Sequence, residues 1–432
     1  MQGYRSFAVT VKGISHTKSG TVCQDSSSFY DDEIMSIAVV ADGHGDNDCF
    51  RSDQGSKLAV ACATRGIQQF VKEHEALFKQ GLIKKPEPPS HKELEKLLRE
   101  KLIKQTVASW NKAVMENYST SPFTEQELAK ASEKYRKRYE KGETVNKAYG
   151  TSLIAAAITP WYWFGFHIGD GRFTVLYEDS SGGQPVPWDS KCYLNVTTSI
   201  CDDDILDRYD DEAERYTGVR TFLSLHTDKA PVSFFICSDG IDDNYPADEK
   251  ENAEHLYRLY REVAVTFAED GYESTCGKDG NSGQIKDLAT GFATKGKGDD
   301  TSLAGIVNLE KLKEAAPQWK VKMAADDDQR AKAKAEAKEK AEAERKAADE
   351  AEAKKAARRK EREAERAAAE TAEKDKGKPQ ADTGENIETY GEFSANAKKA
   401  PEESEDAKSK TELVQDAKKA LDAAAKKIDL LL

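Results

Sequence analysis

Four aspartate-rich clusters flank short apolar runs in about the first 310 residues of the chain. They read DGHG at 42–45, GDGR at 169–172, SDG at 238–240 and GDD at 298–300. A single Asp-Gly dipeptide is most often only a turn. Four such clusters at the ends of expected strands could instead bring Asp42, Asp170, Asp239 and Asp299 together. Converging carboxylates repel one another unless cations lie between them, and oxygen ligands select Mg²⁺ or Mn²⁺.

Two such ions would give the chain a specific chemistry. A pair of divalent cations can lower the pKa of a bound water and hold a phosphoryl oxygen in line for attack. The sequence therefore points to hydrolysis of a phosphate ester.

The order of motifs resembles a known family. The segments GISHTKSGTVCQDS, VVADGHGD, YGTSL, HIGDGR, CSDGIDD and GDDTSLAGI follow one another between about residues 7 and 308. This series is similar to the PPM family, the type 2C metal-dependent serine/threonine protein phosphatases, in the variant common in bacteria. The resemblance implies a hydrolase that acts on phosphoserine and phosphothreonine in phosphoprotein substrates, with two Mn²⁺ or Mg²⁺ ions and a weaker third.

The resemblance also implies roles for individual residues. Asp42 would bridge the two metals and His44 would be the general acid for the leaving oxygen. The implied metal ligands are Asp25 through a water, Asp42, the carbonyl of Gly43, Asp239 and Asp299, with Asp170 and Asp239 for the third ion.

Several residues near the implied metal ligands would support the metals or bind the substrate phosphate. Asp243 is expected in the second shell, and Asp300 is the alternative to Asp299 in the last motif. Two positions depart from the family pattern: Gly20 stands where many members have a phosphate-gripping Arg, and Gln24 stands where many have Glu. Lys18 or His16 could bind the phosphate instead.

The elements around these motifs predict an α+β domain. Strand-like runs occur at 34–45, 149–159, 165–172, 232–240 and 301–308, and helical patterns at 53–71, 92–117, 124–139, 252–268 and 284–294. The resemblance implies two antiparallel sheets in a β-sandwich flanked by helix pairs. A charged helical insertion, expected on the surface, covers about 73–146, and a weakly periodic flap about 182–230.

The composition changes after the expected catalytic domain, residues 1–312. Residues 313–376 are rich in Ala, Lys and Glu and lack the apolar positions of a coiled coil, so we expect a solvated helix. Residues 377–408 are polar enough to be disordered. Residues 409–432 carry an apolar stripe at spacings of three and four, which predicts a terminal helix that binds a protein partner.

Charge, the length of apolar runs and cysteine usage argue against several other classes of protein. Residues 321–432 hold 26 basic and 28 acidic residues, so most of the net charge of −13 belongs to residues 1–320. An acidic domain argues against nucleic acid as a partner. The chain shows neither a signal-peptide pattern nor an apolar run long enough for a membrane span. Seven unpatterned cysteines suit a reduced, cytoplasmic location, and Cys237 lacks the loop of a thiol phosphatase.

Two other functions remain open from the sequence. A non-catalytic scaffold with the same fold would bind phosphoproteins, although it has no need for several costly carboxylates in one place. A phosphomonoesterase for a small molecule would use the same metals behind a different access route.

Overall fold

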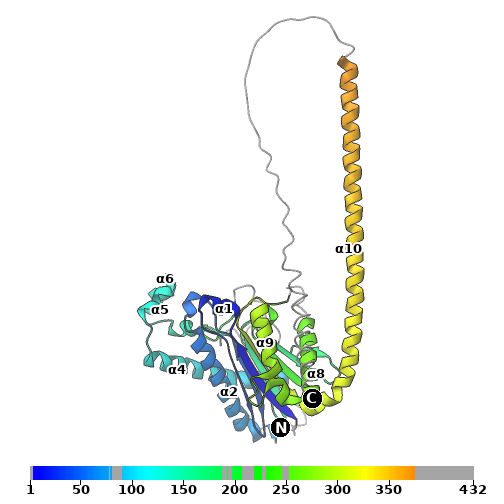
Figure 1. Ribbon diagram of the computed structural model, residues 1–432. Coiled ribbons are helices and arrows are strands. Elements are labelled where there is room, and N and C mark those ends of the chain that lie inside the picture. Colours follow the sequence, from blue (N-terminus) through cyan, green and yellow to red (C-terminus); the bar gives the residue numbers. More distant parts are fainter. Residues whose placement is uncertain are drawn as a thin grey trace. The chain divides into compact units, whose positions relative to one another are not determined.

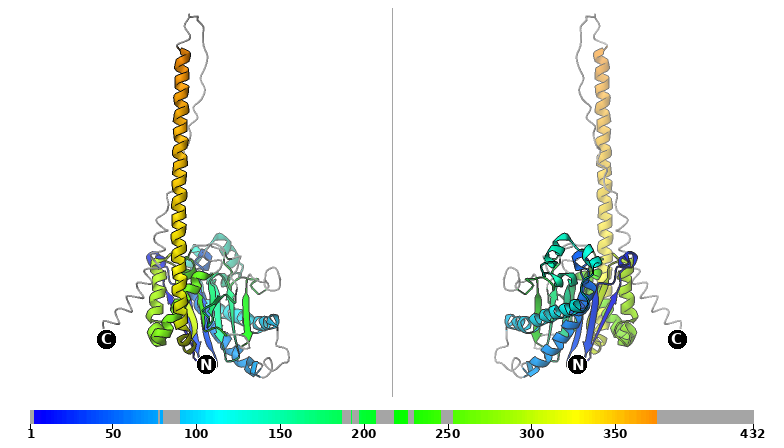
Figure 2. Two further views of the ribbon diagram at one scale, coloured as in Figure 1. Left: turned by 90° about the vertical axis from the view of Figure 1, so that its right-hand side faces the viewer. Right: turned by 90° about the vertical axis from the view of Figure 1, so that its left-hand side faces the viewer.

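The protein, seen in a computed structural model, is described for residues 3–76, 78–79, 90–186, 192, 197–206, 218–225, 230–245 and 253–374. Two five-stranded antiparallel sheets form its centre. Figure 1 shows α2 and α4 on one side of these sheets and α8 and α9 on the other, and Figure 2 shows the same layers from both sides. The expected α+β sandwich of two antiparallel sheets flanked by helices is therefore confirmed.

Each sheet combines strands that are distant in sequence. The first sheet has the order β1-β10-β9-β6-β7, with bounds Tyr4–Val11, Thr301–Asn308, Ser233–Cys237, Arg172–Leu176 and Gly182–Gly183. The second has the order β2-β3-β4-β5-β8, with bounds Ser26–Asp31, Ser36–Ala41, Leu153–Ile158, Tyr162–Ile168 and Arg220–Leu225. This order sets the loops before β2 and β10 beside those after β3 and β9.

The strands are apolar on both faces because both faces are covered. In β3, Ala38 and Val40 join the core between the sheets, whereas Ile37, Val39 and Ala41 join the core beneath the helices. Successive strand residues point to opposite faces, so a strand between two cores reads as a continuous apolar run. This explains why β3 and β4 show no polar alternation.

Helices flank the sheets and connect the strands. Those before β4 are α1 (Ile14–Ser19), η1 (Asn47–Cys49), α2 (Ser52–Ala76), α3 (His91–Leu98), the π-helical turn η3 (Arg99–Ile103), α4 (Lys104–Thr120), α5 (Glu125–Lys130), α6 (Glu133–Tyr139) and η4 (Val145–Tyr149). Those after β9 are α7 (Asp239–Asp242), α8 (Glu254–Cys276), α9 (Gly283–Lys295) and α10 (Leu309–Lys374).

The helical insertion differs from expectation in two ways. The pattern at 124–139 forms two short helices, because Ser132 adopts an extended conformation and caps α6 with its side chain. The insertion is also not confined to the surface. Leu98, Leu102, Trp110 and Val114 are fully buried, and Trp110 Nε1 donates to the carbonyl oxygen of Gly55 at 3.0 Å. The insertion has many charged residues, and the apolar residues between them form a face that packs inward.

The segment 182–230 contains regular structure that its weak periodicity did not predict. Arg220–Leu225 forms β8, the edge strand that pairs with β5. Gly182–Gly183 forms the short strand β7. Strand pairing across the sheet supplies order that local sequence does not indicate.

The first compact unit of the chain extends to Lys320, within α10. Leu312 and Trp319 are buried there, and Trp319 Nε1 donates to the carbonyl oxygen of Glu178 at 2.7 Å. A second unit begins at Val321, and the described side chains of its helix are mostly exposed. The linker predicted at 377–408 and the terminal helix predicted at 409–432 lie outside the described residues.

Two further findings concern the described residues. None of their helices has the length and apolar character needed to cross a membrane. No disulfide joins the seven cysteines, all of which are described.

Candidate metal centre

The ends of strands from both sheets bring several carboxyl groups together. Asp42 follows β3, Asp239 begins α7 directly after β9, and Asp25 precedes β2. Burial raises the pKa of Asp42 well above its usual range, and the charges of Asp25, Asp239 and Asp170 add to the rise. Burial likewise raises the pKa of Asp239, to which Asp170 and Asp299 contribute. Five predicted ligands thus interact electrostatically in one place.

Two of these carboxyl groups share a hydrogen bond. Asp42 and Asp239 are its partners, and the bond raises the pKa of Asp42 while it lowers that of Asp239. Two neighbouring carboxyl groups repel each other when both are charged, which favours a proton between them.

Asp25 is a buried acid with an unused oxygen. Its side chain is 4% exposed, and burial together with the charge of Asp300 raises its pKa to about 7. Its Oδ2 atom finds no hydrogen-bond partner among the described residues. A buried oxygen without a donor is costly, so this atom has a position suited to a cation or a water bound to one.

The donor set fits hard divalent cations. It consists of carboxylate oxygens and the carbonyl of Gly43, which are the ligands that Mg²⁺ and Mn²⁺ prefer. Within the part of the chain that the structure describes, no three His, Cys, Asp or Glu side chains are already arranged to hold an ion.

The turn that carries Asp42 is fixed by its backbone. The amide of Asp42 donates to Ser152 Oγ at 3.1 Å, and its carbonyl oxygen accepts from the Ser152 amide and from Thr151 Oγ1, both at 2.8 Å. Gly43 must be a glycine, since a Cβ there would lie 2.6 Å from the carbonyl oxygen of Gln24 and 2.8 Å from that of Ser52. The YGTSL segment thus positions the metal turn.

His44 lies next to this turn and is half-buried. Its amide donates to the carbonyl oxygen of Gly150 at 3.1 Å. Its Nε2 atom has no hydrogen-bond partner among the described residues. Burial, together with the positive charge of Lys147, lowers the pKa of His44 to about 4. The imidazole is therefore neutral near pH 7.

The loop before β2 is held by Asp300. Its carboxylate accepts from the amide of Gly13 at 2.7 Å and from the amide of Gln24 at 2.6 Å. His16 Nδ1 lies 2.9 Å from the same carboxylate, close enough for an ion pair but without the alignment of a hydrogen bond. Because Gln24 adjoins Asp25, this buried aspartate positions a predicted ligand rather than facing solvent.

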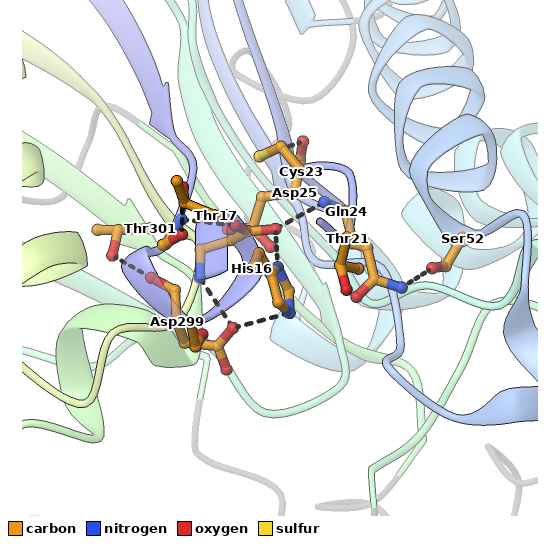
Figure 3. A network of polar contacts seen from close by, with 12 residues as sticks. His16, Thr17, Thr21, Cys23, Gln24, Asp25, Ser52, Asp299 and Thr301 are labelled. Atoms are coloured by element: carbon orange, nitrogen blue, oxygen red, sulfur yellow. Dashed lines mark hydrogen bonds and ion pairs between the residues drawn. The ribbon is translucent and has the colours of Figure 1, made fainter. Parts of the chain in front are cut away.

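Gln24 connects this loop to the metal turn. Its Nε2 donates to Ser52 Oγ at 2.6 Å and to the carbonyl oxygen of His44 at 3.1 Å. Figure 3 shows this network, with Gln24 directed at Ser52 and His16 beside Asp299. A glutamine thus takes a structural role at the position where many family members have Glu.

The remaining predicted residues lie at the edge of the centre. Asp299 is exposed and lies 3.8 Å from His16 Nε2. Asp243 forms an ion pair with Lys297 at 3.0 Å. Lys18 is exposed on α1. Burial raises the pKa of Asp170, and the charge of Asp243 contributes to the rise.

One buried group beside the centre was not found from the sequence. Arg172 Nε and Nη2 lie 3.0 and 2.9 Å from Asp242 Oδ2, and His255 Nε2 lies 2.8 Å from Asp242 Oδ1. Arg172 follows Asp170 by two residues and Asp242 follows Asp239 by three, so the pair links two loops that carry predicted ligands. Arg172 and Asp242 could have been noticed as charged residues beside apolar runs. Nothing in the sequence around His255 indicates that it contacts them.

Comparisons with known proteins agree with the motif order. Residues 12–274 match the family model described as "Protein phosphatase 2C". No curated protein matches the sequence.

Several solved structures are similar to this chain. A bacterial serine phosphatase is 14% identical, with 71% of this chain and 98% of that chain covered and a TM-score of 0.37. The catalytic domain of the serine/threonine phosphatase PstP in complex with two manganese ions is 13% identical, with coverage of 70% and 97% and a TM-score of 0.34. Stp1 from Staphylococcus aureus is 14% identical, with coverage of 71% and 95% and a TM-score of 0.35. Likenesses this distant carry no argument about activity.

Proposed function

Since the chain belongs to the protein phosphatase 2C family, a family of serine/threonine phosphatases, we propose that it hydrolyses phosphoserine and phosphothreonine in proteins with two Mn²⁺ or Mg²⁺ ions. The observation that carries the proposal is the convergence of buried carboxyl groups at the strand ends, whose charges raise one another's pKa. A protein has a reason to keep such a costly cluster when cations neutralise it.

Each proposed ligand would belong to a particular ion site. Asp42 would hold both ions and the Gly43 carbonyl one of them, Asp239 and Asp299 would complete one site, and Asp25 would act through water. Asp170 would join Asp239 at a weaker third site. Bound divalent cations supply Lewis-acid chemistry, since they withdraw charge from phosphoryl oxygens and lower the pKa of water.

His44 is proposed to assist the leaving serine or threonine oxygen. A neutral imidazole donates from one ring nitrogen, and Nε2 of His44 has no hydrogen-bond partner among the described residues that would compete for that role. For the phosphate, the contacts favour Lys18 over His16, because His16 already lies against both Asp299 and Asp300. Lys18 sits on the same short helix and is exposed to an incoming anion.

The test compares two substrates under three metal conditions. Hydrolysis of p-nitrophenyl phosphate and of a phosphothreonine peptide is measured with Mn²⁺, with Mg²⁺ and with EDTA, for the wild type and for Asp239→Asn. We expect metal-dependent turnover of both substrates that the substitution lowers by at least about 10²-fold. Turnover of the ester alone would favour a small-molecule phosphomonoesterase. No turnover while calorimetry shows Mn²⁺ bound would favour a phosphoprotein-binding scaffold.

A protein partner is proposed for residues 409–432, on the basis of their apolar stripe. Deletion of this segment should leave turnover of the small ester intact and weaken binding to the partner. Loss of both properties together would contradict the proposal.

A further inference from the structure

A pocket of about 440 Å³ lies beside the candidate centre, and we call it the insert pocket. Its polar walls include Asp48, Lys134, Tyr135, Arg138, Thr144 and Lys147. Most of them belong to α6 and η4 of the helical insertion, and residues 201–203 also line the pocket. No predicted metal ligand lines it, so the pocket is separate from the place where phosphate is cleaved.

The pocket nevertheless reaches the neighbourhood of His44. Lys147 and Cys201 line it, and Gly150 follows Lys147 by three residues. A Cβ built on Gly150 would lie 3.0 Å from His44 Cδ2 and 3.2 Å from Cys201 Sγ. The positive charge of Lys147 is also felt by His44. A substrate whose leaving oxygen is at His44 therefore has its adjoining residues near the mouth of this pocket.

The hydroxyl groups in the pocket wall are unsatisfied. Tyr135 is 3% exposed, yet its Oη atom has no hydrogen-bond partner among the described residues, and the same is true of the buried Oγ1 atom of Thr144. Both residues line the pocket. A buried hydroxyl without a partner costs free energy unless a ligand or water supplies one.

The carboxylates of the pocket, by contrast, are already engaged. Asp48 accepts from the amide and the hydroxyl of Ser132 at 2.7 and 2.8 Å. Asp202 accepts from the Ser199 amide at 3.0 Å. Arg138 forms ion pairs with Glu143 at 3.2 Å and with Asp203 at 3.5 Å.

Lys134 and Lys147 supply the remaining positive charge. Lys147 is half-buried, and although the charges of Asp202 and Asp46 act on it, no side-chain hydrogen bond or ion pair joins it to the residues that the structure describes. Its ammonium group only donates, so it favours a ligand that accepts hydrogen bonds and carries negative charge.

We propose that the insert pocket binds an anionic side chain of the phosphoprotein substrate, close to the phosphorylated residue. This subsite rests on the proposed phosphatase function and gives it a sequence preference. An extended peptide advances about 3.3 Å per residue, so a Glu within a few residues of the phosphothreonine can enter the pocket while the phosphate remains at the centre. Lys147 would pair with its carboxylate, and Tyr135 would donate a hydrogen bond.

The experiment measures a ratio within each protein. Two phosphothreonine peptides are identical except for Glu or Gln beside the phosphorylated residue, and kcat/KM is determined for both. We expect the wild type to prefer the Glu peptide about tenfold, the size of one charge-assisted hydrogen bond. Lys147→Met should bring the ratio close to one, and Tyr135→Phe should lower it about threefold. Effects on the chemical step cancel because both peptides share it.

Two controls separate the pocket from folding and from surface charge. Lys130→Met removes an exposed lysine on α5 outside the pocket and should retain the full preference. Tyr135→Phe should not lower the unfolding temperature, because the hydroxyl it removes has no partner. A wild type without preference overturns the proposal, and so does a preference that survives Lys147→Met.

Failure of the phosphatase function is recognised separately. A protein that hydrolyses neither peptide nor p-nitrophenyl phosphate fails the proposed function. The pocket is then tested by fluorescence anisotropy with the labelled Glu peptide. Weaker binding by Lys147→Met than by the wild type supports the pocket, and equal binding overturns it.

Discussion

Asp242→Asn is a substitution for which the structure predicts a large loss of stability. Asp242 is 4% exposed and its carboxylate contacts both Arg172, which is 1% exposed, and His255. The amide keeps the shape of the side chain but removes its charge, so the buried guanidinium of Arg172 loses the carboxylate that lies 2.9 Å from its Nη2 atom. Breaking a buried ion pair in this way costs about 3–5 kcal/mol, a large part of the 5–15 kcal/mol typical of a whole domain.

The assay is urea unfolding followed by circular dichroism at pH 7. Glu133→Gln serves as the control, since its ion pair with Lys137 at 2.6 Å is exposed on both sides and should contribute at most about 1 kcal/mol. A loss of less than 1 kcal/mol for Asp242→Asn, equal to that of the control, would refute the reasoning. It would mean that water or a shifted side chain takes over the charge of Arg172.

Three further predictions follow from the same contacts. Gly43→Ala should lower the unfolding free energy by about 1–3 kcal/mol, because its Cβ would meet two backbone carbonyl oxygens within 2.8 Å, whereas Gly291→Ala meets nothing within 4 Å and should not destabilise; thermal unfolding compares them. The ion pair with Arg51 lowers the pKa of Glu127 from 4.5 to about 2, so it stabilises the fold above about pH 4.5 and this contribution is lost as the pH falls toward 2; Glu127→Gln should flatten that part of the acid unfolding curve. Mn²⁺ at about 100 times its Kd should stabilise the wild type by about 2.7 kcal/mol, measured by thermal shift, and Asp239→Asn should abolish the gain.

The fold was predictable where sequence patterns are local. The apolar runs located β3, β9 and β10, and helical periodicity located α2, α8 and α9 to within a few residues at most ends. The break between α5 and α6 was not predictable in this way. Ser132 is held there by Asp48, 84 residues earlier in the chain, through its amide and its hydroxyl. Ser132 is a residue type that favours a helix N-cap, but the long-range contact that holds it there cannot be read from the sequence of 124–139.

That Asp42 and Asp239 come together was predictable for a similar reason, while their role as metal ligands stays a prediction. Asp42 and Asp239 lie in short motifs whose residue types already indicate metal chemistry. What supports them comes from elsewhere: Ser152 fixes the turn of Asp42 from 110 residues away, and His255 reaches Asp242 from the start of α8. Such partners become visible only when the order of strands in the sheets is known.

The two neighbouring aspartates before β10 illustrate how position separates identical side chains. Asp300 is buried and both of its carboxylate oxygens accept backbone hydrogen bonds, from Gly13 and from Gln24. Asp299 is exposed, and its charge contributes to the raised pKa of Asp239. A carboxylate whose oxygens are both occupied has little left to offer a cation, whereas its neighbour retains an open face. The geometry therefore supports Asp299 as the proposed ligand and gives Asp300 the task of holding the loop that carries Asp25.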